Sequence, residues 1–302
     1  MIKRSSRLED MIKRFNTVEQ AKFYINSLDG NFDDYVLEDK QYKTSLNKVF
    51  NDLDTLGKTQ IIDREFVPNF VFGPDDIVVV VGQDGMVANV LKYLNKQPLV
   101  GVNPDSGRYD GILLPFRPEE CYNIVKKGID QGFELKEVTM AKVRLSDGQV
   151  LYAVNDFFVG HRGHVSFRYS ISQDDFSERQ SSSGIIVSTG LGSTGWMKSI
   201  LTGAGSIINK LTGSHHDFTL NQNKEWDRES LTYSVREPFT SKNTSANLSF
   251  GFINQSSELS IQSQTAENCV IFSDGIESDF LDFNAGVTAV FGLADKKGQL
   301  VY

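Results

Sequence analysis

The apolar run Ile77 to Val81 constrains the fold of this chain more than any other segment. Its β-branched residues leave no polar face, as a strand requires when both faces of its sheet are covered, which is typical of parallel sheets. The run ends at the turn Gly82-Gln83-Asp84-Gly85, and apolar residues then recur at helical spacing from Val87 to Leu94. The sequence therefore predicts a strand, a tight turn and a helix, the repeating unit of α/β domains.

Helices and further strands are predicted around this unit. The first sixty residues show capping residues and apolar residues at helical spacing, so we expect helices there and no N-terminal strand. The predicted helices cover 17–28, 42–57 and 118–132, and two further short strands cover 99–102 and 112–114.

Beyond Gly132 the apolar residues alternate with a period of two, which indicates half-buried strands. The turn Ser146-Asp147-Gly148-Gln149 separates two such runs and predicts a hairpin. One helix, from about Ser193 to Leu211, interrupts the strands. The predicted strands are 135–145, 150–159, 165–171, 184–187, 231–235, 246–252, 259–262, 270–273 and 287–292.

The predicted fold is an α/β N-terminal domain with a parallel sheet, followed by a mostly antiparallel β domain. We expect the α/β domain, with its helical N-terminal extension, over residues 1–132 and the β-rich domain over 133–285. The C-terminal segment 286–302 is expected to return toward the first domain. The polar stretch 213–229, which carries His215 and His216, is expected to be a surface loop or lid.

Composition limits the classes of function. The 302 residues include two cysteines, Cys121 and Cys269, which is too few for a disulfide framework and fits free thiols in a reducing compartment. A formal net charge of −8 argues against nucleic acid as a partner. The longest apolar run is far shorter than the roughly 18 residues of a membrane helix. We therefore expect a soluble, cytoplasmic protein that binds neither nucleic acid nor a membrane.

The turn at 82–85 is the strongest candidate for a ligand site. Its glycines let the backbone approach a ligand, and N–H groups at a helix start attract phosphate oxygens. Asp84 follows the carboxyl end of a parallel strand, where open α/β sheets bind their ligands. Because a carboxylate repels phosphate, Asp84 suits a ribose hydroxyl, as its hydrogen-bond partner or as the base that takes its proton. An ordinary turn with an aspartate cap fits the same residues.

A second candidate is the segment Ser188-Thr189-Gly190-Leu191-Gly192-Ser193-Thr194-Gly195-Trp196. Small residues and hydroxyl groups gather there around the start of the predicted helix. Such a loop lets an adenine or a phosphate come close to the backbone while the hydroxyls supply hydrogen bonds. Taken alone, the pattern also fits a simple turn.

Five ordered segments resemble the NAD kinases, which belong to a superfamily with the diacylglycerol kinases. The turn at 82–85 resembles the Gly-Gly-Asp-Gly signature, and 189–196 resembles the Thr-Pro-Thr-Gly-Ser-Thr-Ala-Tyr segment. Gly101-Val102-Asn103 is similar to a Gly-Ile-Asn segment, Asn155-Asp156 looks like an Asn-Glu pair, and Asp274-Gly275 is similar to a late Asp-Gly. Their order and rough spacing agree from about residue 75 to the C-terminus.

The resemblance implies an enzyme that transfers phosphate from ATP or polyphosphate, with Mg²⁺, to the 2'-hydroxyl of the adenosine ribose of NAD, giving NADP. It implies that Asp84 is catalytic and activates that hydroxyl, and that the protein is a homo-oligomer. The implied nucleotide- and NAD-binding residues are Gly82, Gln83, Gly85, Asn103, Asn155, Asp156, Thr189, Gly192, Ser193, Thr194, Gly195 and Trp196. Three cations beside these motifs are candidates for phosphate binding: Arg108, Arg162 and Lys198.

The sequence departs from the family pattern at three positions in these motifs. Gln83 replaces the second signature glycine, Met86 replaces a threonine, and Asp156 is one methylene shorter than the usual glutamate. Two alternatives therefore stay open: a related kinase that acts on another hydroxyl, and a nucleotide-binding sensor without phosphoryl transfer.

The histidines do not indicate a metal site. His161 and His164 lie three residues apart between two predicted strands, and His215 and His216 lie in a polar stretch. Because these histidines lack the neighbouring cysteine or carboxylate pattern of a transition-metal site, we expect no such metal.

Overall fold

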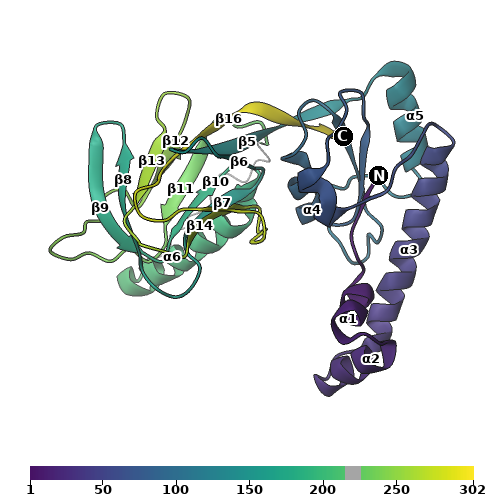
Figure 1. The fold of residues 1–302 in the computed structure, drawn as a ribbon, viewed down its shortest axis with the longest axis horizontal. Helices are drawn as coiled ribbons and strands as arrows, with labels where there is room; N and C mark the ends of the chain where they lie inside the picture. Colours follow the sequence, from purple (N-terminus) through teal and green to yellow (C-terminus); the bar gives the residue numbers. More distant parts are fainter. Residues whose placement is uncertain (215–225) are drawn as a thin grey trace. The chain divides into compact units, whose positions relative to one another are not determined.

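The computed structural model describes residues 1–214 and 226–302 and divides the chain into two compact units (Figure 1). Unit 1 consists of Met1–Lys136 with Gln299–Tyr302, and unit 2 consists of Glu137–Gly298. The boundary thus falls after Lys136, where the sequence analysis places it after residue 132, and of the segment 286–302 only the last residues belong to unit 1. Most of the loop expected at 213–229, with both of its histidines, lies outside the described residues.

Unit 1 is built on a parallel sheet. Its central strand β3 pairs with β4 so that Val78 lies opposite Leu99 and Val81 opposite Val102. The four valines of β3 are at most 3% exposed, as expected for a strand covered on both faces. The strands of this unit are β1 (Ile2–Lys3), β2 (Ile62–Asp63), β3 (Val78–Val81), β4 (Pro98–Val102) and the end of β16 (Thr288–Val301).

Helices cover this sheet. Tyr42 and Val49 of α3 and Val125 of α5 pack in one hydrophobic cluster. The cluster also contains the side chains of β3 and β4 that point to this face of the sheet. Thr17 is the N-cap of α2, and its hydroxyl accepts a hydrogen bond from the N–H of Gln20. The helices are α1 (Arg7–Phe15), α2 (Val18–Ser27), α3 (Phe32–Asp54), the 3₁₀ helix η1 (Arg64–Asn69), α4 (Asp84–Leu91) and α5 (Cys121–Gln131).

Two predictions for unit 1 are wrong. A strand exists at the N-terminus, where Ile2 pairs with Ile62 and with Val80; two residues are too few to produce a detectable alternation in the sequence. Residues 112–114 form a turn and not a strand, closed by a hydrogen bond from the N–H of Leu114 to the carbonyl of Gly111. The leucines of this turn are buried, and their burial explains the apolar pattern without strand pairing.

Unit 2 contains a mostly antiparallel β structure in two groups of strands. The first group holds β9, β8, β13 and β16 in this order; β5 pairs with β16, and β6 pairs with β5. The second group holds β12, β11, β10, β7, β14 and β15. The predicted fold class is confirmed. The strands are β5 (Leu135–Leu145), β6 (Val150–Ala153), β7 (Asp156–His161), β8 (Phe167–Gln173), β9 (Phe176–Ser182), β10 (Ile185–Ser188), β11 (Leu231–Val235), β12 (Phe250–Ile253), β13 (Leu259–Ser263), β14 (Cys269–Ser273) and β15 (Phe280–Asp282).

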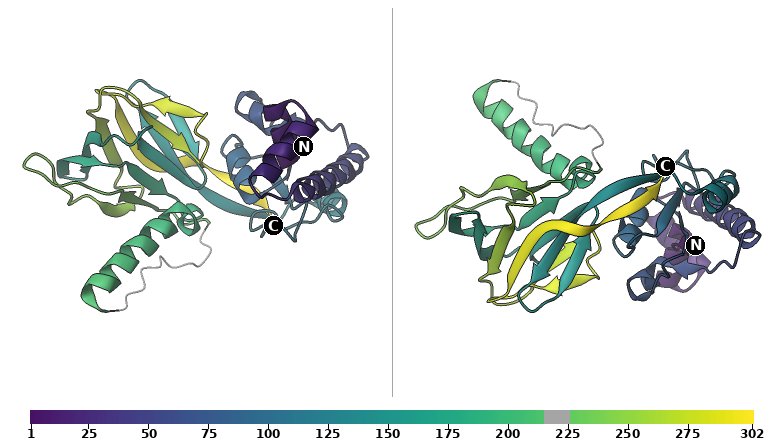
Figure 2. Two further views of the ribbon diagram at one scale, coloured as in Figure 1. Left: turned by 90° about the horizontal axis from the view of Figure 1, so that it is seen from below. Right: turned by 90° about the horizontal axis from the view of Figure 1, so that it is seen from above.

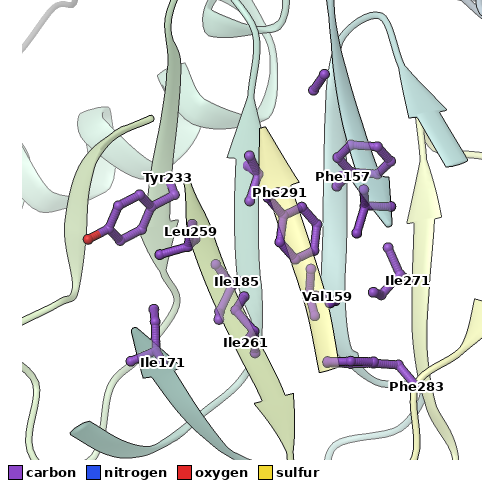
Figure 3. Close-up of a cluster of buried hydrophobic side chains, with 14 of the residues drawn as sticks. Phe157, Val159, Ile171, Ile185, Tyr233, Leu259, Ile261, Ile271, Phe283 and Phe291 are labelled. Carbon is purple, nitrogen blue, oxygen red and sulfur yellow. The ribbon is translucent and has the colours of Figure 1, made fainter. Parts of the chain in front are cut away.

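The core of unit 2 lies between these two groups of strands. Phe157 of β7 and Phe291 of β16 meet edge to face, with ring centroids 5.7 Å apart (Figure 3). The beginning of α6 (Trp196–Thr212) lies against the other face of the six-stranded sheet (Figure 2). Met197, Ile186 and Phe158 pack together in this contact. The described residues include no helix with the length and apolar character needed to cross a bilayer.

Candidate functional site

The candidate catalytic carboxylate lies at the carboxyl end of β3. Asp84 is the first residue of α4 and follows the N-cap residue Gln83. Its Oδ1 accepts a hydrogen bond of 2.6 Å from the backbone N–H of Leu113. The half-buried side chain is therefore held by a neighbouring loop and does not cap its own helix, which rules out the simple aspartate-cap interpretation.

The two departures beside Asp84 differ in their consequences. Met86 is fully buried, and a Cβ placed on Gly82 would lie 2.6 Å from the Met86 sulfur. Gly82 therefore makes room for a methionine that fills the core beneath the turn. Gln83, in contrast, is exposed, so its amide is available to a ligand that approaches the turn.

Asn103 organises the loop that holds Asp84. Its Nδ2 donates to the carbonyl of Tyr109 at 3.0 Å, and its Oδ1 accepts from the N–H of Asp105 at 3.1 Å. A Cβ on Gly101 would lie 2.1 Å from the carbonyl oxygen of Leu113, so the loop packs directly on the end of β4. The predicted residues of unit 1 are thus brought together around one turn and one loop.

In unit 2 three candidate segments meet at one end of the six-stranded sheet. Asp156 begins β7 and lies opposite Ser188, the last residue of β10. Its neighbour Phe157 lies opposite Ser273, the last residue of β14. The antiparallel pairing therefore collects the segments around 155, 189 and 274 at the same edge.

Asp274 fixes the backbone at this edge. Its carboxylate accepts hydrogen bonds from the N–H groups of Val154 at 3.1 Å, Asn155 at 2.6 Å and Asp156 at 3.3 Å. Asp274 and Gly275 both have positive φ, 55° and 72°, as the two central residues of a type I′ turn do. Asp274-Gly275 is one of the five segments that resemble the NAD kinases, but the implied site residues did not include Asp274.

The Thr189 loop packs on the same backbone. The Thr189 hydroxyl donates to the carbonyl of Val154 at 2.6 Å and accepts from the N–H of Gly192 at 3.1 Å. A Cβ on Gly192 would lie 1.9 Å from the carbonyl oxygen of Asn155. The structure thus places the predicted residues Asn155, Thr189 and Gly192 in direct contact.

The remaining hydroxyls of this loop stabilise its turn. Ser193 donates to the carbonyl of Gly190 at 2.7 Å and Thr194 donates to that of Leu191 at 3.2 Å. The N–H of Gly195 donates to the carbonyl of Gly192 at 2.9 Å, which closes the 3₁₀ turn η2 (Gly192–Thr194) before α6 begins. Each hydroxyl oxygen keeps acceptor capacity for a ligand.

The carboxyl group of Asp156 is an unusually weak acid. Burial, and secondarily the charge of Asp274, raise its pKa from 3.8 to about 7. The side chain therefore holds a proton in a large share of molecules near neutral pH. In that state it can donate a hydrogen bond as well as accept one, so the two forms bind a hydroxyl differently.

This raised pKa predicts a pH-dependent stability. Because the folded chain binds the Asp156 proton more tightly than the unfolded chain, the stabilisation is present below pH 3.8 and is lost as pH rises to about 7. Thermal unfolding of Asp156→Asn should lack this loss, so at pH 8 the variant should be more stable than the parent chain by on the order of 2 kcal/mol.

The exposed Asp175 offers a matched control for this comparison. Asp175→Asn should keep the pH-dependent loss of the parent chain, because it leaves the buried Asp156 in place. Equal slopes for the parent chain and Asp156→Asn between pH 4 and 8 would contradict the raised pKa.

The three candidate cations differ in their surroundings. The Arg108 guanidinium in unit 1 contacts both carboxylate oxygens of Asp34, at 3.1 and 2.6 Å. Arg162 follows the far end of β7, about 20 Å of extended chain from Asp156, and lies 3.9 Å from the ring centroid of Phe280. Lys198 is exposed in the first turn of α6, beside the Thr189 loop.

Trp196 faces a different part of unit 2 from Asn155. Its ring is parallel to that of Phe158, with centroids 5.8 Å apart, and both line a cavity of about 590 Å³. Arg162, His161 and His164 line the same cavity. The expectation of no transition-metal site stays a prediction; within residues 1–214 and 226–302, no group of three or more metal-ligating side chains occurs.

Known proteins that resemble this chain in sequence include NAD kinases from different organisms. An NAD kinase of Chloroherpeton thalassium is 32% identical over 139 residues, which is 44% of this chain and 47% of that protein. The mitochondrial NAD kinase 2 of Rattus norvegicus is 28% identical over 270 residues, 68% of this chain and 63% of the rat protein. The chain therefore matches about half to two thirds of the length of these relatives. No family model matches it.

Two solved structures resemble a larger share of the chain than these relatives do. An NAD kinase from Archaeoglobus fulgidus, solved in complex with ATP, gives a TM-score of 0.57 at 20% identity and covers 85% of this chain and 89% of its own. Yeast NADH kinase complexed with NADH gives 0.59 at 15% identity and covers 86% and 79%. The α/β unit followed by an antiparallel β unit is the fold of these kinases. The chain is thus similar to NAD kinases in sequence over part of its length and in fold.

Proposed function

We propose that the chain transfers a phosphoryl group from ATP or polyphosphate to the 2'-hydroxyl of the adenosine ribose of NAD, forming NADP. The observation that carries the proposal is the Asp84 carboxylate, fixed after a buried parallel strand by the N–H of Leu113. The relatives that carry the NAD kinase name, and the similar folds solved with ATP and with NADH, support it.

In this mechanism Asp84 acts as the general base. The Leu113 N–H binds Oδ1, so we assign Oδ2 to the substrate hydroxyl. Oδ2 takes the hydroxyl proton while the hydroxyl oxygen forms a bond to the terminal phosphorus of the donor. The bond between that phosphorus and its bridging oxygen breaks, and the shortened donor leaves with the electron pair.

Unit 2 supplies the proposed dinucleotide-binding residues. Asn155 and Asp156 are proposed to hold a ribose, and the Thr189 loop is proposed to surround the adenine. The backbone at Asn155 is fixed by Asp274 and by Gly192, so its side chain has a defined starting direction. Such preorganisation reduces the entropy that binding must remove.

Lys198 is the cation that we propose for phosphate binding in unit 2. Its side chain is exposed close to Gly195, whereas Asp34 already neutralises Arg108 and Arg162 lies at the far end of β7. Replacement of Lys198 by alanine should raise KM for a phosphorylated substrate by about 3- to 10-fold with little change in kcat. Steady-state kinetics with Lys210→Ala, at the other end of α6, provide the control.

Magnesium enters the proposal together with the donor. Mg²⁺ in kinase sites is held by one or two carboxylates, waters and substrate phosphates. Because the two oxygens of Asp84 are assigned to the Leu113 N–H and to the substrate hydroxyl, the phosphates of the donor and waters would hold the ion. The described residues fit an ion that arrives on the phosphates. When bound, it would offset negative charge on the phosphoryl oxygens.

Two further features belong to the proposal. We propose a homo-oligomer, supported by the exposed apolar residues Ile207 and Leu211 on α6, which are 62% and 82% exposed. We also propose a cytoplasmic location, where NAD and ATP are both abundant.

The test is NADP formation by the purified chain from NAD and Mg²⁺ with ATP or with polyphosphate. Product with either donor supports the proposal and identifies the donor. Tight NAD binding without product would favour a sensor. ATP consumption with a different hydroxyl compound, and none with NAD, would favour the related kinase; either result overturns the proposal.

A further inference from the structure

We infer that the helical N-terminal extension positions the catalytic carboxylate through one polar face of α3. The inference rests on the proposed function, because it takes Asp84 as the base. It assigns positioning roles to Asp34, Glu38 and Tyr42, none of which the sequence motifs indicated.

The polar residues of this face follow the helical repeat. Asp34, Glu38, Gln41 and Ser45 are spaced by four, three and four residues, so they lie on one side of α3. All four contact the loop that begins at Asn103. Such a stripe on a helix that also packs on the sheet forms a rigid support for the loop.

The contacts lie in the first part of the loop, between Pro104 and Tyr109. Ser45 donates to the carbonyl of Pro104 at 3.0 Å, and Gln41 donates to the same oxygen at 3.3 Å. Asp34 binds the guanidinium of Arg108 in a two-pronged ion pair. This pairing holds the pKa of the Asp34 carboxyl well below its usual range, chiefly through the Arg108 hydrogen bond.

Arg4 ties the same face to the next residue of the loop. Its Nη2 donates to Glu38 at 2.6 Å and to the hydroxyl of Tyr109 at 2.9 Å. Glu38 is only 2% exposed, so the ion pair is largely shielded from solvent and from salt. The carbonyl of Tyr109 in turn accepts from the amide of Asn103.

Tyr42 reaches the other side of the catalytic turn from the same helix. Its hydroxyl donates to the carbonyl of Val81 at 2.9 Å and accepts from the N–H of Arg4. Val81 is the last residue of β3, three positions before Asp84. Burial raises the pKa of Tyr42 to about 12, so the hydroxyl remains a donor at physiological pH.

These bonds connect α3 to the loop, and the backbone of the loop continues from Tyr109 to the residue that binds the reacting group. The helix holds the loop at Pro104, Arg108 and Tyr109, and the same loop ends at Leu113, whose N–H binds Asp84. A shift of about 1 Å in a positioning group can cost on the order of 10²-fold in rate. Arg108 is thus a positioning residue whose charge serves the loop and not a phosphate.

The test compares Asp34→Asn with Asp33→Asn, a change of the same charge on an exposed neighbour in the same turn of α3. Asp34→Asn should lower kcat by about 10- to 100-fold, with KM for NAD and for ATP within about threefold. Asp34→Glu should restore part of the rate. Asp33→Asn should match the parent chain.

Three kinetic results would overturn the inference. One is a kcat for Asp34→Asn within threefold of the parent. Another is a lower KM for ATP at unchanged kcat, which would mean that Asp34 had been masking Arg108 as a phosphate-binding group. The third is an equal loss for Asp33→Asn.

Hydrogen exchange separates this inference from the proposed function. Asp34→Asn should speed amide exchange in residues 104–114 and leave β7 and β10 unchanged, whether or not the chain phosphorylates NAD. Unchanged exchange in 104–114 overturns the positioning role even in an active enzyme. Faster exchange in a chain without NAD kinase activity would retain the support of the loop and refute the proposed function.

Discussion

Replacement of Asp84 by asparagine is expected to lower kcat by about 10²- to 10⁴-fold while the Kd for NAD stays within about twofold. The asparagine carbonyl can still accept the 2.6 Å hydrogen bond from the N–H of Leu113, so the turn keeps its geometry. The amide cannot take a proton, so general base catalysis is lost. Steady-state NADP formation and calorimetric NAD binding measure the two quantities separately.

Asp110→Asn is the matched control for this prediction. Asp110 is exposed and lies on the same loop as Leu113, so the variant makes the same charge change without touching the turn. A loss of less than threefold for Asp84→Asn would remove Asp84 from the chemical step. A parallel loss in both variants would point to the overall charge of the loop.

The strand, turn and helix around Asp84 could be predicted because each depends on neighbours in the sequence. The burial of β3 and the start of α4 follow from runs of a few residues. The bond from Leu113 to Asp84 joins residues 29 positions apart and uses a backbone N–H. Since every residue type except proline offers such a group, no residue pattern marks it.

In the candidate site of unit 2 as well, the motifs could be predicted from the sequence and the contacts between them could not. The glycines and hydroxyls of the Thr189 loop were visible as a motif, and so was the Asn155-Asp156 pair. Their contact, however, depends on antiparallel pairing of β7 with β10 and β14. The three hydrogen bonds that Asp274 accepts span about 120 positions of the chain, beyond the reach of any local pattern.

Charge was the least predictable property. Arg108, Arg162 and Lys198 lie at similar sequence distances from motifs, yet one binds Asp34, one lies on Phe280 and one is exposed. A sequence gives the sign of a side chain, whereas its partner is decided by which distant carboxylate or ring the fold brings near. Proximity to a motif therefore gives no basis for choosing among these cations, and our proposal of Lys198 rests on its exposure.

Replacement of Gly192 by alanine is the second change with a large expected effect. The new Cβ would lie 1.9 Å from the carbonyl oxygen of Asn155 and 2.5 Å from its carbon. Both atoms belong to the backbone, so no side-chain rotation relieves the clash. We expect NAD affinity to fall at least about tenfold and the unfolding temperature to drop by several degrees, as about 1–3 kcal/mol of overpacking implies.

To relieve this clash, one of two hydrogen bonds at Asn155 must break. The Asn155 N–H is held by Asp274 at 2.6 Å, and its carbonyl accepts from the N–H of Thr189 at 2.9 Å. If the carbonyl moves, the Asn155 side chain turns away from the ligand; if the loop moves, Thr189 leaves the backbone of Val154. Both outcomes disturb residues that we assign to NAD, so affinity should fall by either route.

Gly203→Ala separates this effect from a general intolerance of alanine. Gly203 lies within α6 with open space around its Cβ position, and alanine favours a helix by up to about 1 kcal/mol over glycine. That variant should keep its NAD affinity and melt at the same or a higher temperature. If Gly192→Ala melts lower but binds NAD as the parent chain does, the Thr189 loop supports the sheet end without contacting the dinucleotide, and the adenine site must lie elsewhere in unit 2.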